Sequence, residues 1–280
     1  MKGVHKGIDV FSIEEAKEIF PSYFEGRETE AKRFIFLPKN FQASEMWKIT
    51  EPESVEIYLS KGASLQLWID PIIDGAFEVH AHLEEGAFFS RFYAGEKKNL
   101  ITLKSRYMLK KGAKLLHFSW TEAVERTEES ILATIEGEGA EVDLVGGWHL
   151  IDRERIGVNV VVEHRAPCAR SNQLFKGVVE ESARSSFEGS IYVAKGADKT
   201  ESFQRNNNCV FGAAQAKTAP GIKVFHDDVK ASHGATIAKP SKEDLFYLVS
   251  RGVNETRAKE LLIQAFLAEV QNFGAPIWKL

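Results

Sequence analysis

The chain has 280 residues, with 36 basic and 40 acidic side chains and a formal net charge of −4 at pH 7. This balance excludes the usual kind of nucleic-acid-binding protein, which concentrates Lys and Arg on one face. The hydrophobic content of 44% and the charged content of 27% are those of an ordinary globular protein, and they exclude a disordered or collagen-like chain.

The chain has two cysteines, Cys168 and Cys209, which are 41 residues apart. This number and spacing exclude a disulfide framework and a Cys-x-x-Cys metal knuckle, and they favour a reducing compartment. The first residues contain no apolar segment of the signal-peptide type, and no window approaches the roughly 20 apolar residues of a membrane span. We therefore expect a soluble, cytoplasmic protein that binds neither nucleic acid nor a membrane.

Residues 1–50 are expected to form an N-terminal segment with a short helix. Ser12 is a favourable N-cap, and Glu15, three positions later, completes a capping box before the helix runs towards Pro21.

Residues 51–239 show the periodicity of short strands. Two examples are the apolar segments 65–69 and 158–162, whereas residues 122–131 are ambiguous between helix and strand. A Gly-Ala pair preceded by charged residues recurs between these strands, with successive spacings of 24, 26 and 27 residues and then a gap of 57, about two further units. The clear members begin at Gly62, Gly86, Gly112, Gly139 and Gly196; Gly75 and Gly212 are weaker members, and Ala166 and Ala183 occupy similar places in the long gap.

Repeats of this length with a glycine corner predict a β-helix, because stacked copies bury an apolar face that one copy cannot bury alone. Glycine suits such corners since it accepts a positive φ angle. The alternative is a β-sandwich whose hairpin turns contain Gly-Ala, because regularly spaced turns also occur in sandwiches.

Residues 240–280 are expected to be helical. Ser241 to Asp244 form a capping-box variant, and Gly252 is placed to end the helix that they begin. A second helix begins near Asn254 and ends near Gly274 and Pro276. Its apolar positions follow helical spacing and are Ala258, Leu261, Leu262, Ala265, Phe266 and Val270. This apolar face either packs on the solenoid or is partly exposed for a partner.

Several clusters carry reactive side chains without a recognised catalytic spacing. His80 and His82 lie on one face of a strand and lack an identifiable third zinc ligand. The segment 226–236 is the densest in reactive groups, but Asp227 and Asp228 point to opposite faces if it is extended, which disfavours glycoside hydrolysis. The run Asn206–Asn208 is expected at a corner, and each cysteine is by default a core residue.

Three blocks of sequence, at residues 164–177, 227–236 and 245–252, resemble the SufB/SufD family of iron–sulfur cluster assembly proteins. The similarity extends over roughly residues 160–272, and it implies a right-handed parallel β-helix flanked by helical segments. The segment 232–236 resembles the SufD pattern, since Gly234 stands where SufB members have Glu. Family members usually carry a longer N-terminal helical region, so the resemblance indicates a short member.

The resemblance implies a non-catalytic scaffold that works with a SufC-like ATPase and pairs with a SufB-like subunit. SufC would dock near residues 241–272, and the candidate contacts are Leu245, Phe246, Tyr247, Arg251, Leu262 and Phe266. A nascent iron–sulfur cluster would form transiently at the interface with SufB, and this chain would bind no nucleotide itself.

His233 is the main candidate for a cluster or metal ligand at that interface, with Cys209 and Cys168 as weaker thiol candidates. One histidine is not sufficient to hold a cluster, which usually has about four ligands. The alternatives are a self-paired scaffold that works with SufC alone, and, more distantly, a carbohydrate-active β-helix enzyme. A homodimer is possible for the isolated chain.

Overall fold

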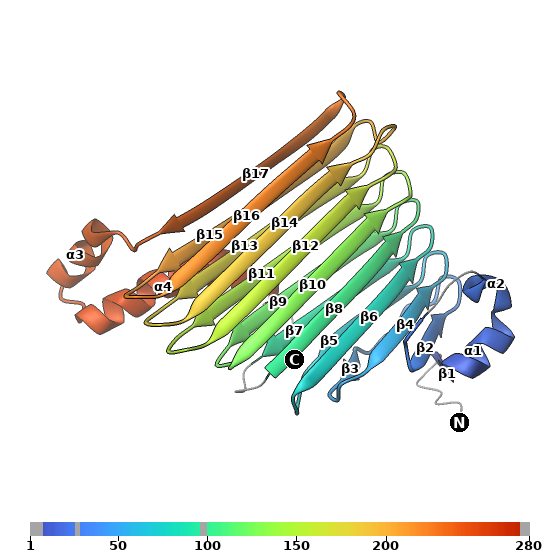
Figure 1. Cartoon of the computed structure of the whole chain (residues 1–280), viewed down its shortest axis with the longest axis horizontal. Coiled ribbons are helices and arrows are strands. Elements are labelled where there is room, and N and C mark those ends of the chain that lie inside the picture. Colours follow the sequence, from blue (N-terminus) through green and yellow to red (C-terminus); the bar gives the residue numbers. More distant parts are fainter. Residues whose placement is uncertain (1–7, 26–28, 96–99, 275–280) are drawn as a thin grey trace.

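The computed structural model describes residues 8–25, 29–95 and 100–274. These residues form a β-solenoid in which two sheets face each other (Figure 1). In each coil the chain runs along one sheet, turns a corner and returns along the other, so each strand pairs in parallel with the strand two places away. The β-helix predicted from the Gly-Ala repeat is confirmed, and the sandwich alternative is wrong, because strands adjacent in sequence belong to opposite sheets.

The nine-stranded sheet carries β1 and the even-numbered strands. Its members are β1 (Asp9–Ser12), β2 (Arg33–Leu37), β4 (Ser54–Leu59), β6 (Gly75–Leu83), β8 (Leu100–Leu109), β10 (Arg126–Ile135), β12 (Arg155–His164), β14 (Arg184–Val193) and β16 (Gln215–Val224). The segment that was ambiguous from sequence, residues 122–131, lies mainly in β10. Among the strands of the described residues, only β1 is antiparallel to its neighbour.

The eight-stranded sheet carries the odd-numbered strands from β3 onward. Its members are β3 (Trp47–Ile49), β5 (Ser64–Ile69), β7 (Phe88–Gly95), β9 (Lys114–Glu122), β11 (Glu141–Leu150), β13 (Arg170–Val179), β15 (Thr200–Val210) and β17 (Val229–Ala238). Since β2 and β3 pair with β4 and β5, both sheets extend into the first 50 residues.

A ladder of corners joins the coils where the chain passes from the nine-stranded to the eight-stranded sheet. One residue in each corner has a positive φ angle and donates its N–H to a carbonyl oxygen in the next coil, as Gly112 does to Glu138 at 2.9 Å. The positions of this corner ladder are Asn40, Gly62, Gly86, Gly112, Gly139, Cys168 and Lys199. After four of them comes the predicted alanine, fully buried, at Ala63, Ala87, Ala113 and Ala140.

The later corners differ from the Gly-Ala pattern. Cys168 takes the glycine position with φ +57°, and the alanine after it, Ala169, is buried. At the next corner Gly196 has a positive φ angle and Ala197 is buried, but Lys199 occupies the ladder position. Ala183 lies at the opposite edge of the solenoid, so its expected equivalence to the Gly-Ala pairs is wrong.

Two sets of helices cover parts of the outer faces. Helices α1 (Ile13–Ile19) and α2 (Pro21–Phe24) pack an aromatic cluster against the start of the nine-stranded sheet, and the predicted capping box of Ser12 and Glu15 is present. Helix α4 (Glu255–Gly274) lies on the outer face of the eight-stranded sheet. Among the described residues, no helix has the length and apolar character needed to cross a bilayer.

The buried face of α4 is rotated from the predicted one. Ile263, Leu267 and Val270 pack against the sheet, whereas Ala265 is exposed and Leu262 is half-buried. The stripe is apolar at nearly every position from 261 to 267, so helical spacing alone did not decide its orientation.

The corner ladder makes a prediction about stability. Gly112→Ala should lower the free energy of unfolding by about 1 kcal/mol, because an L residue is disfavoured at φ +61°. A Cβ atom there would meet no atom within 4 Å, so the cost is conformational and not steric. The measurement is the midpoint of urea unfolding.

Gly234→Ala is the matched control. Gly234 is also free of neighbours within 4 Å of an added Cβ atom, but its φ angle is not in the left-handed region. The control should not lower stability, since alanine loses less chain entropy than glycine on folding. Equal losses in the two variants would contradict the role assigned to the ladder.

Candidate functional site

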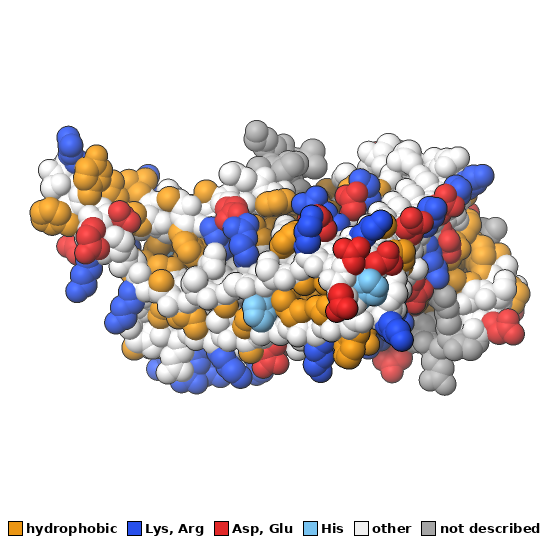
Figure 2. Space-filling view, turned by 90° about the horizontal axis from the view of Figure 1, so that it is seen from above, with side chains coloured by type: hydrophobic (Ala, Val, Ile, Leu, Met, Phe, Trp, Pro, Cys, Tyr) orange, Lys and Arg blue, Asp and Glu red, His pale blue; other side chains and the backbone are white. Residues whose placement is uncertain are grey.

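The solenoid ends in a coil that no other described strand covers. Strands β16 and β17 are the last members of their sheets, and their outer edges pair with no strand in the described part of the chain. In this last coil the inward positions, which are buried in the preceding coils, are half-exposed or exposed. Figure 2 looks onto this end and shows hydrophobic and histidine side chains between rows of charged ones. The open end is therefore both apolar and rich in unpaired backbone groups.

His233 lies on β17 and belongs to the inner face of this coil. The register pairs it with Gln204 of β15, and Gln204 is 1% exposed inside the solenoid. Side chains paired in this way point to the same side of the sheet, so His233 points inward as well. It remains exposed because nothing in the described structure covers β17. The neighbouring Ala231 and Ala235 share this inner face through their partners Ser202 and Asn206.

A column of glutamines continues beneath His233. Gln204 pairs in register with Gln173 of β13, and its Nε2 donates a hydrogen bond of 2.7 Å to Gln173 Oε1. Gln204 Oε1 and Gln173 Nε2 are buried without a hydrogen-bond partner among the described residues. Orphaned polar atoms of this kind cost stability unless another group or water satisfies them. The column of Gln173 and Gln204 therefore leaves an unsatisfied amide oxygen, Gln204 Oε1, just below His233 in the open coil.

Other buried polar groups surround this column. His164 Nε2 lies 2.8 Å from Ser171 Oγ, and Ser171 Oγ lies 2.6 Å from Ser202 Oγ. Asn206 and Asn208 also point inward from the middle of β15, and Asn208 Nδ2 donates to Asn206 Oδ1 at 2.8 Å. The predicted corner position of this asparagine run is therefore wrong. A run of three asparagines resembles turn sequence, because composition does not show that alternate residues of a strand point into a solenoid core.

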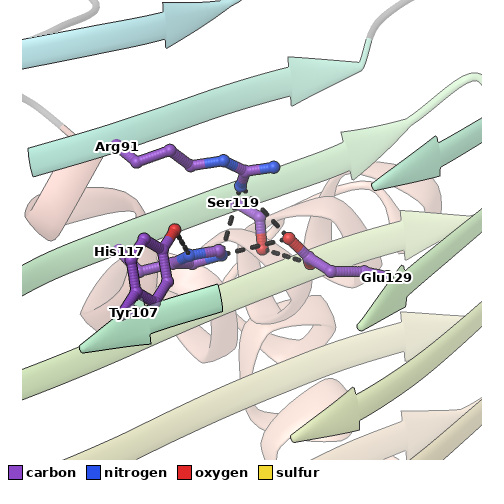
Figure 3. Close-up of polar contacts among 5 residues, drawn as sticks. All are labelled: Arg91, Tyr107, His117, Ser119 and Glu129. Carbon is purple, nitrogen blue, oxygen red and sulfur yellow. Dashed lines mark hydrogen bonds and ion pairs between the residues drawn. The ribbon is translucent and has the colours of Figure 1, made fainter. Parts of the chain in front are cut away.

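A second polar cluster lies further along the interior (Figure 3). Arg91, His117 and Glu129 are fully or almost fully buried, and Arg91 Nη1 lies 3.1 Å from Glu129 Oε1. Ser119 and Tyr107 complete the cluster through hydrogen bonds of 2.8 Å to Glu129 Oε2 and His117 Nδ1. A neutral imidazole finds a partner on each side in either tautomer, because Nδ1 faces the Tyr107 hydroxyl while Nε2 lies 3.0 Å from the acceptor Glu129 Oε1 and 3.1 Å from the donor Arg91 Nη1.

Burial decides which of these groups are charged. It lowers the pKa of His117 to about 4, with a further contribution from the Arg91 charge. Burial alone would raise the pKa of Glu129, but the hydrogen bond from His117 and the charges nearby outweigh it and lower this pKa to about 2. The interior therefore holds an Arg–Glu ion pair beside a neutral histidine.

The two polar regions belong to one inward column. The register runs from Arg91 to His117, then to Leu144, and then to Gln173. Leu144 is fully buried and apolar, so it separates the charged cluster from the glutamines and from His233. Sequence reasoning found His233 but missed Arg91, His117, Gln173 and Gln204. The signal that it lacked was the coil register, which places these residues at intervals of 26 to 31 positions.

The two cysteines lie far from each other and from His233's inner face. Cys209 points outward from β15 and packs beside α4, and burial raises the pKa of its thiol. Cys168 is exposed at a corner beyond the start of β13. Since Cys209 is in register with Val178 near the end of β13, the two thiols are on the order of 25 Å apart at 3.3 Å per residue. The structure brings neither of them together with His233.

The other histidine pair that the sequence singled out is held by carboxylates. His80 Nδ1 lies 3.5 Å from Glu56 Oε2, and His82 Nε2 lies 2.9 Å from Glu84 Oε1. Within residues 8–25, 29–95 and 100–274, no group of three or more His, Cys, Asp and Glu side chains is placed to hold a metal ion.

The C-terminal helices offer a different kind of surface. Helix α3 (Lys242–Ser250) has no buried residue, and Figure 1 shows it projecting beyond the ends of the strands. Phe246 is 72% exposed and Tyr247 is 58% exposed, whereas Leu245 is half-buried. Arg251 stacks over the Tyr247 ring at 5.4 Å. Phe246 and Tyr247 thus form an exposed aromatic surface on α3, while Leu262 and Phe266 of α4 are half-buried and Phe266 packs against the cluster between α4 and the sheet.

Ion pairs attach α4 to the eight-stranded sheet. Glu269 lies 2.9 Å from Lys176 Nζ and 2.7 Å from Arg205 Nη2, and Lys259 pairs with the largely buried Glu180. Lys176 Nζ also lies 4.9 Å from the Phe266 ring. Phe266 therefore contributes to holding α4 in place, whereas Phe246 contacts no core cluster.

The sequence of the chain matches a known protein family. Residues 51–266 match the family model described as SUF system FeS cluster assembly, SufBD core domain. The chain is 42% identical over 110 residues to an iron–sulfur cluster assembly protein SufD of Escherichia coli, a stretch that is 39% of this chain and 26% of the relative.

Two further relatives are SufBD family iron–sulfur cluster assembly proteins. One, of Synechocystis, is 34% identical over 173 residues, which are 60% of this chain and 35% of the relative. The other, of Mycobacterium leprae, is 29% identical over 172 residues, which are 58% of this chain and 44% of the relative. The matched part of the chain thus spans between about a quarter and less than half of the length of these curated relatives.

The buried histidines predict a loss of stability in acid. Burial lowers the pKa of both His117 and His164 to about 4, so the folded chain keeps them neutral while the unfolded chain protonates them near pH 6.5. The free energy of unfolding should therefore fall as the pH drops from about 6.5 to 4, by roughly 3 kcal/mol for each histidine. Glu129, with its lowered pKa, extends the loss below pH 4.5.

The measurement is the urea midpoint from pH 8 to pH 4, with His164→Gln as the informative variant. Glutamine retains a hydrogen-bonding group for Ser171 but does not titrate, so the variant should lose less stability on acidification than the wild type. His226→Gln, in the loop between β16 and β17, is the matched control, because it replaces a half-buried histidine outside the solenoid interior. Identical pH profiles for wild type and His164→Gln would show that His164 is not the group responsible.

Proposed function

The chain belongs to the SufBD core family of the SUF system for iron–sulfur cluster assembly, and we propose that it is a SufD-like scaffold subunit of that system. In this proposal it pairs with a SufB-like subunit through its open last coil and binds a SufC-like ATPase through α3 and the adjoining part of α4. Its role is non-catalytic, and nucleotide hydrolysis belongs to the ATPase.

One observation supports the proposed pairing with a SufB-like subunit. The last coil places His233 on its inner face and leaves the outer edges of β16 and β17 without a partner strand in the described chain. A strand edge with unpaired N–H and C=O groups is a template for another strand. A second solenoid docked here would extend both sheets and cover the half-exposed inner positions. It would also enclose His233 between the two subunits.

The iron–sulfur cluster is the cargo of this interface in the proposal. His233 supplies one imidazole, a suitable ligand for iron. The remaining ligands come from the pairing subunit, because one histidine falls short of the usual set of about four. Cys209, beneath α4, and Cys168, at an exposed corner, lie away from this inner face and are not assigned as cluster ligands.

The exposed aromatic side chains of α3 support the docking of an ATPase. Phe246 and Tyr247 lie on a helix without any buried residue, so their apolar area is available to a partner. Large aromatic side chains that become buried at the centre of an interface contribute most of its binding energy. We therefore assign α3 as the primary contact and the half-buried Leu262 and Phe266 as its support.

Co-purification with the SufC-like ATPase of the same organism tests the docking. Phe246→Ser should weaken binding about 30-fold, which corresponds to about 2 kcal/mol for an aromatic hot spot. The chain should remain folded, since Phe246 packs against no core cluster. Ile73→Ser, which removes a 52%-exposed apolar side chain from the loop between β5 and β6, is the matched control and should bind normally. A chain that folds but never binds the ATPase, with or without nucleotide, would overturn the proposal.

The pairing surface is tested by Ile237→Asp. Ile237 is 49% exposed on the inner face of β17, so a carboxylate there leaves the core intact but becomes buried when another solenoid covers the coil. The variant should lose association with a SufB-like subunit in sedimentation experiments, whereas Thr236→Asp, on the outer face, should lose less. If the wild type instead forms a homodimer that Ile237→Asp dissociates, the self-paired scaffold is the correct version.

A further inference from the structure

Gln204 lies directly beneath His233 in the stack of coils. The two residues are partners in the parallel register of β15 and β17, and adjacent strands are about 4.8 Å apart. Both side chains point into the solenoid, so the Gln204 amide lies within reach of the imidazole when the His233 side chain rotates about its own bonds.

The Gln204 amide is held at one end and free at the other. Its Nε2 donates to Gln173 Oε1 at 2.7 Å, and its Oε1 has no hydrogen-bond partner among the described residues. Gly189 of β14 leaves room for this arrangement, because a Cβ atom there would lie 2.2 Å from Gln204 Nε2. The free carbonyl oxygen is therefore fixed in position, buried and unsatisfied.

The polar neighbours of Gln204 on the same strand are already engaged. Ser202 Oγ is hydrogen-bonded to Ser171 Oγ at 2.6 Å, and Asn206 Nδ2 donates to the carbonyl oxygen of Phe175 at 3.4 Å. In the next coil the flanking inner residues are Ala231 and Ala235, which have no polar side chain. His233 is thus the inner side chain of β17 placed to donate to Gln204 Oε1.

We propose that Gln204 is a positioning residue for His233, with its Oε1 accepting the imidazole N–H. The hydrogen bond fixes one tautomer of the ring and directs the unprotonated nitrogen away from the core, towards the open end of the solenoid. Satisfying a buried carbonyl oxygen favours this geometry. Histidines that bind metals commonly donate their other N–H to an oxygen in the same way. The use of the outward nitrogen as a cluster ligand rests on the proposed function, whereas the hydrogen bond itself does not.

The test measures the His233 tautomer in the full chain without any partner. Side-chain ¹⁵N shifts distinguish the two neutral tautomers and the imidazolium form, and His233→Gln identifies the resonances. In the wild type at pH 8 one tautomer should exceed the other by at least about fivefold relative to a peptide of the same local sequence, the effect of a hydrogen bond of about 1 kcal/mol. Gln204→Leu should return the ratio to that of the peptide. An unchanged ratio in this variant would overturn the proposal.

Gln204→Glu decides which way the amide faces. A carboxylate accepts but does not donate, so this variant should retain the wild-type tautomer; a switch to the opposite tautomer would mean that Gln204 donates to the ring. Gln173→Leu is the matched control one coil deeper in the same column. It removes a buried amide of the same size but leaves the Gln204 acceptor, so it should change the tautomer ratio less than Gln204→Leu does. Equal effects would indicate general loosening of the coil and would overturn the assignment.

The outcomes separate this inference from the proposed function. If the chain binds neither the ATPase nor a pairing subunit but the tautomer depends on Gln204, the scaffold proposal is wrong and the positioning role remains. If both partners bind but the tautomer ignores Gln204, the scaffold proposal remains and the positioning role is wrong.

Discussion

The register between coils is the constraint on which the rest of this structure depends. Each coil repeats the path of the one before it, so every inward side chain stacks on the residue at the same place in its neighbours. The corner ladder maintains this register through one positive-φ residue per coil and its hydrogen bond to the next coil. A residue is therefore accepted at an inward position only if it suits the column above and below it, and apolar columns are the simplest solution.

The exceptions to apolar columns show how the solenoid accommodates polar groups. Arg91, His117 and Glu129 are tolerated because an ion pair and hydrogen bonds join them and because the histidine remains neutral, although Arg91 Nε and Nη2 have no hydrogen-bond partner among the described residues. Near the last coil the solution is different: the amides of Gln173 and Gln204 bond in sequence along the column, and the final acceptor is left over. The Arg91 cluster lies between coils on both sides, whereas the amide ladder ends beneath the last coil and has a place for one more hydrogen-bonding group there.

Some parts of this architecture follow from the sequence alone. The Gly-Ala corners predict a stacked fold, because they repeat at 24 to 27 residues and require the backbone freedom of glycine. The composition of the inward columns cannot be predicted from the sequence. The coil length grows to 29 and 31 residues where Cys168 and Lys199 replace glycine in the corner ladder, so a constant repeat does not identify the stacked residues. Without knowledge of these coil lengths, nothing in the sequence relates Gln173, Gln204 and His233 to one another. The orientation of α4 also needed the structure, because its apolar stripe is too broad to define one face.

The two ends of the solenoid differ in how well their coils are covered. An uncovered last coil costs stability, because its apolar inner positions remain in contact with water. At the first end, the edge of β2 is paired with the antiparallel strand β1, and Ile8 and Val10 pack against the core of the solenoid. Strands β16 and β17 have no such cover in the described chain, and their inner positions remain partly hydrated. Repeat folds usually protect their terminal units, and the proposed pairing would give this exposed coil the cover that it lacks in the described chain. The coil presents His233 there above an unsatisfied amide oxygen, and an imidazole that becomes covered must find hydrogen-bonding partners for both ring nitrogens.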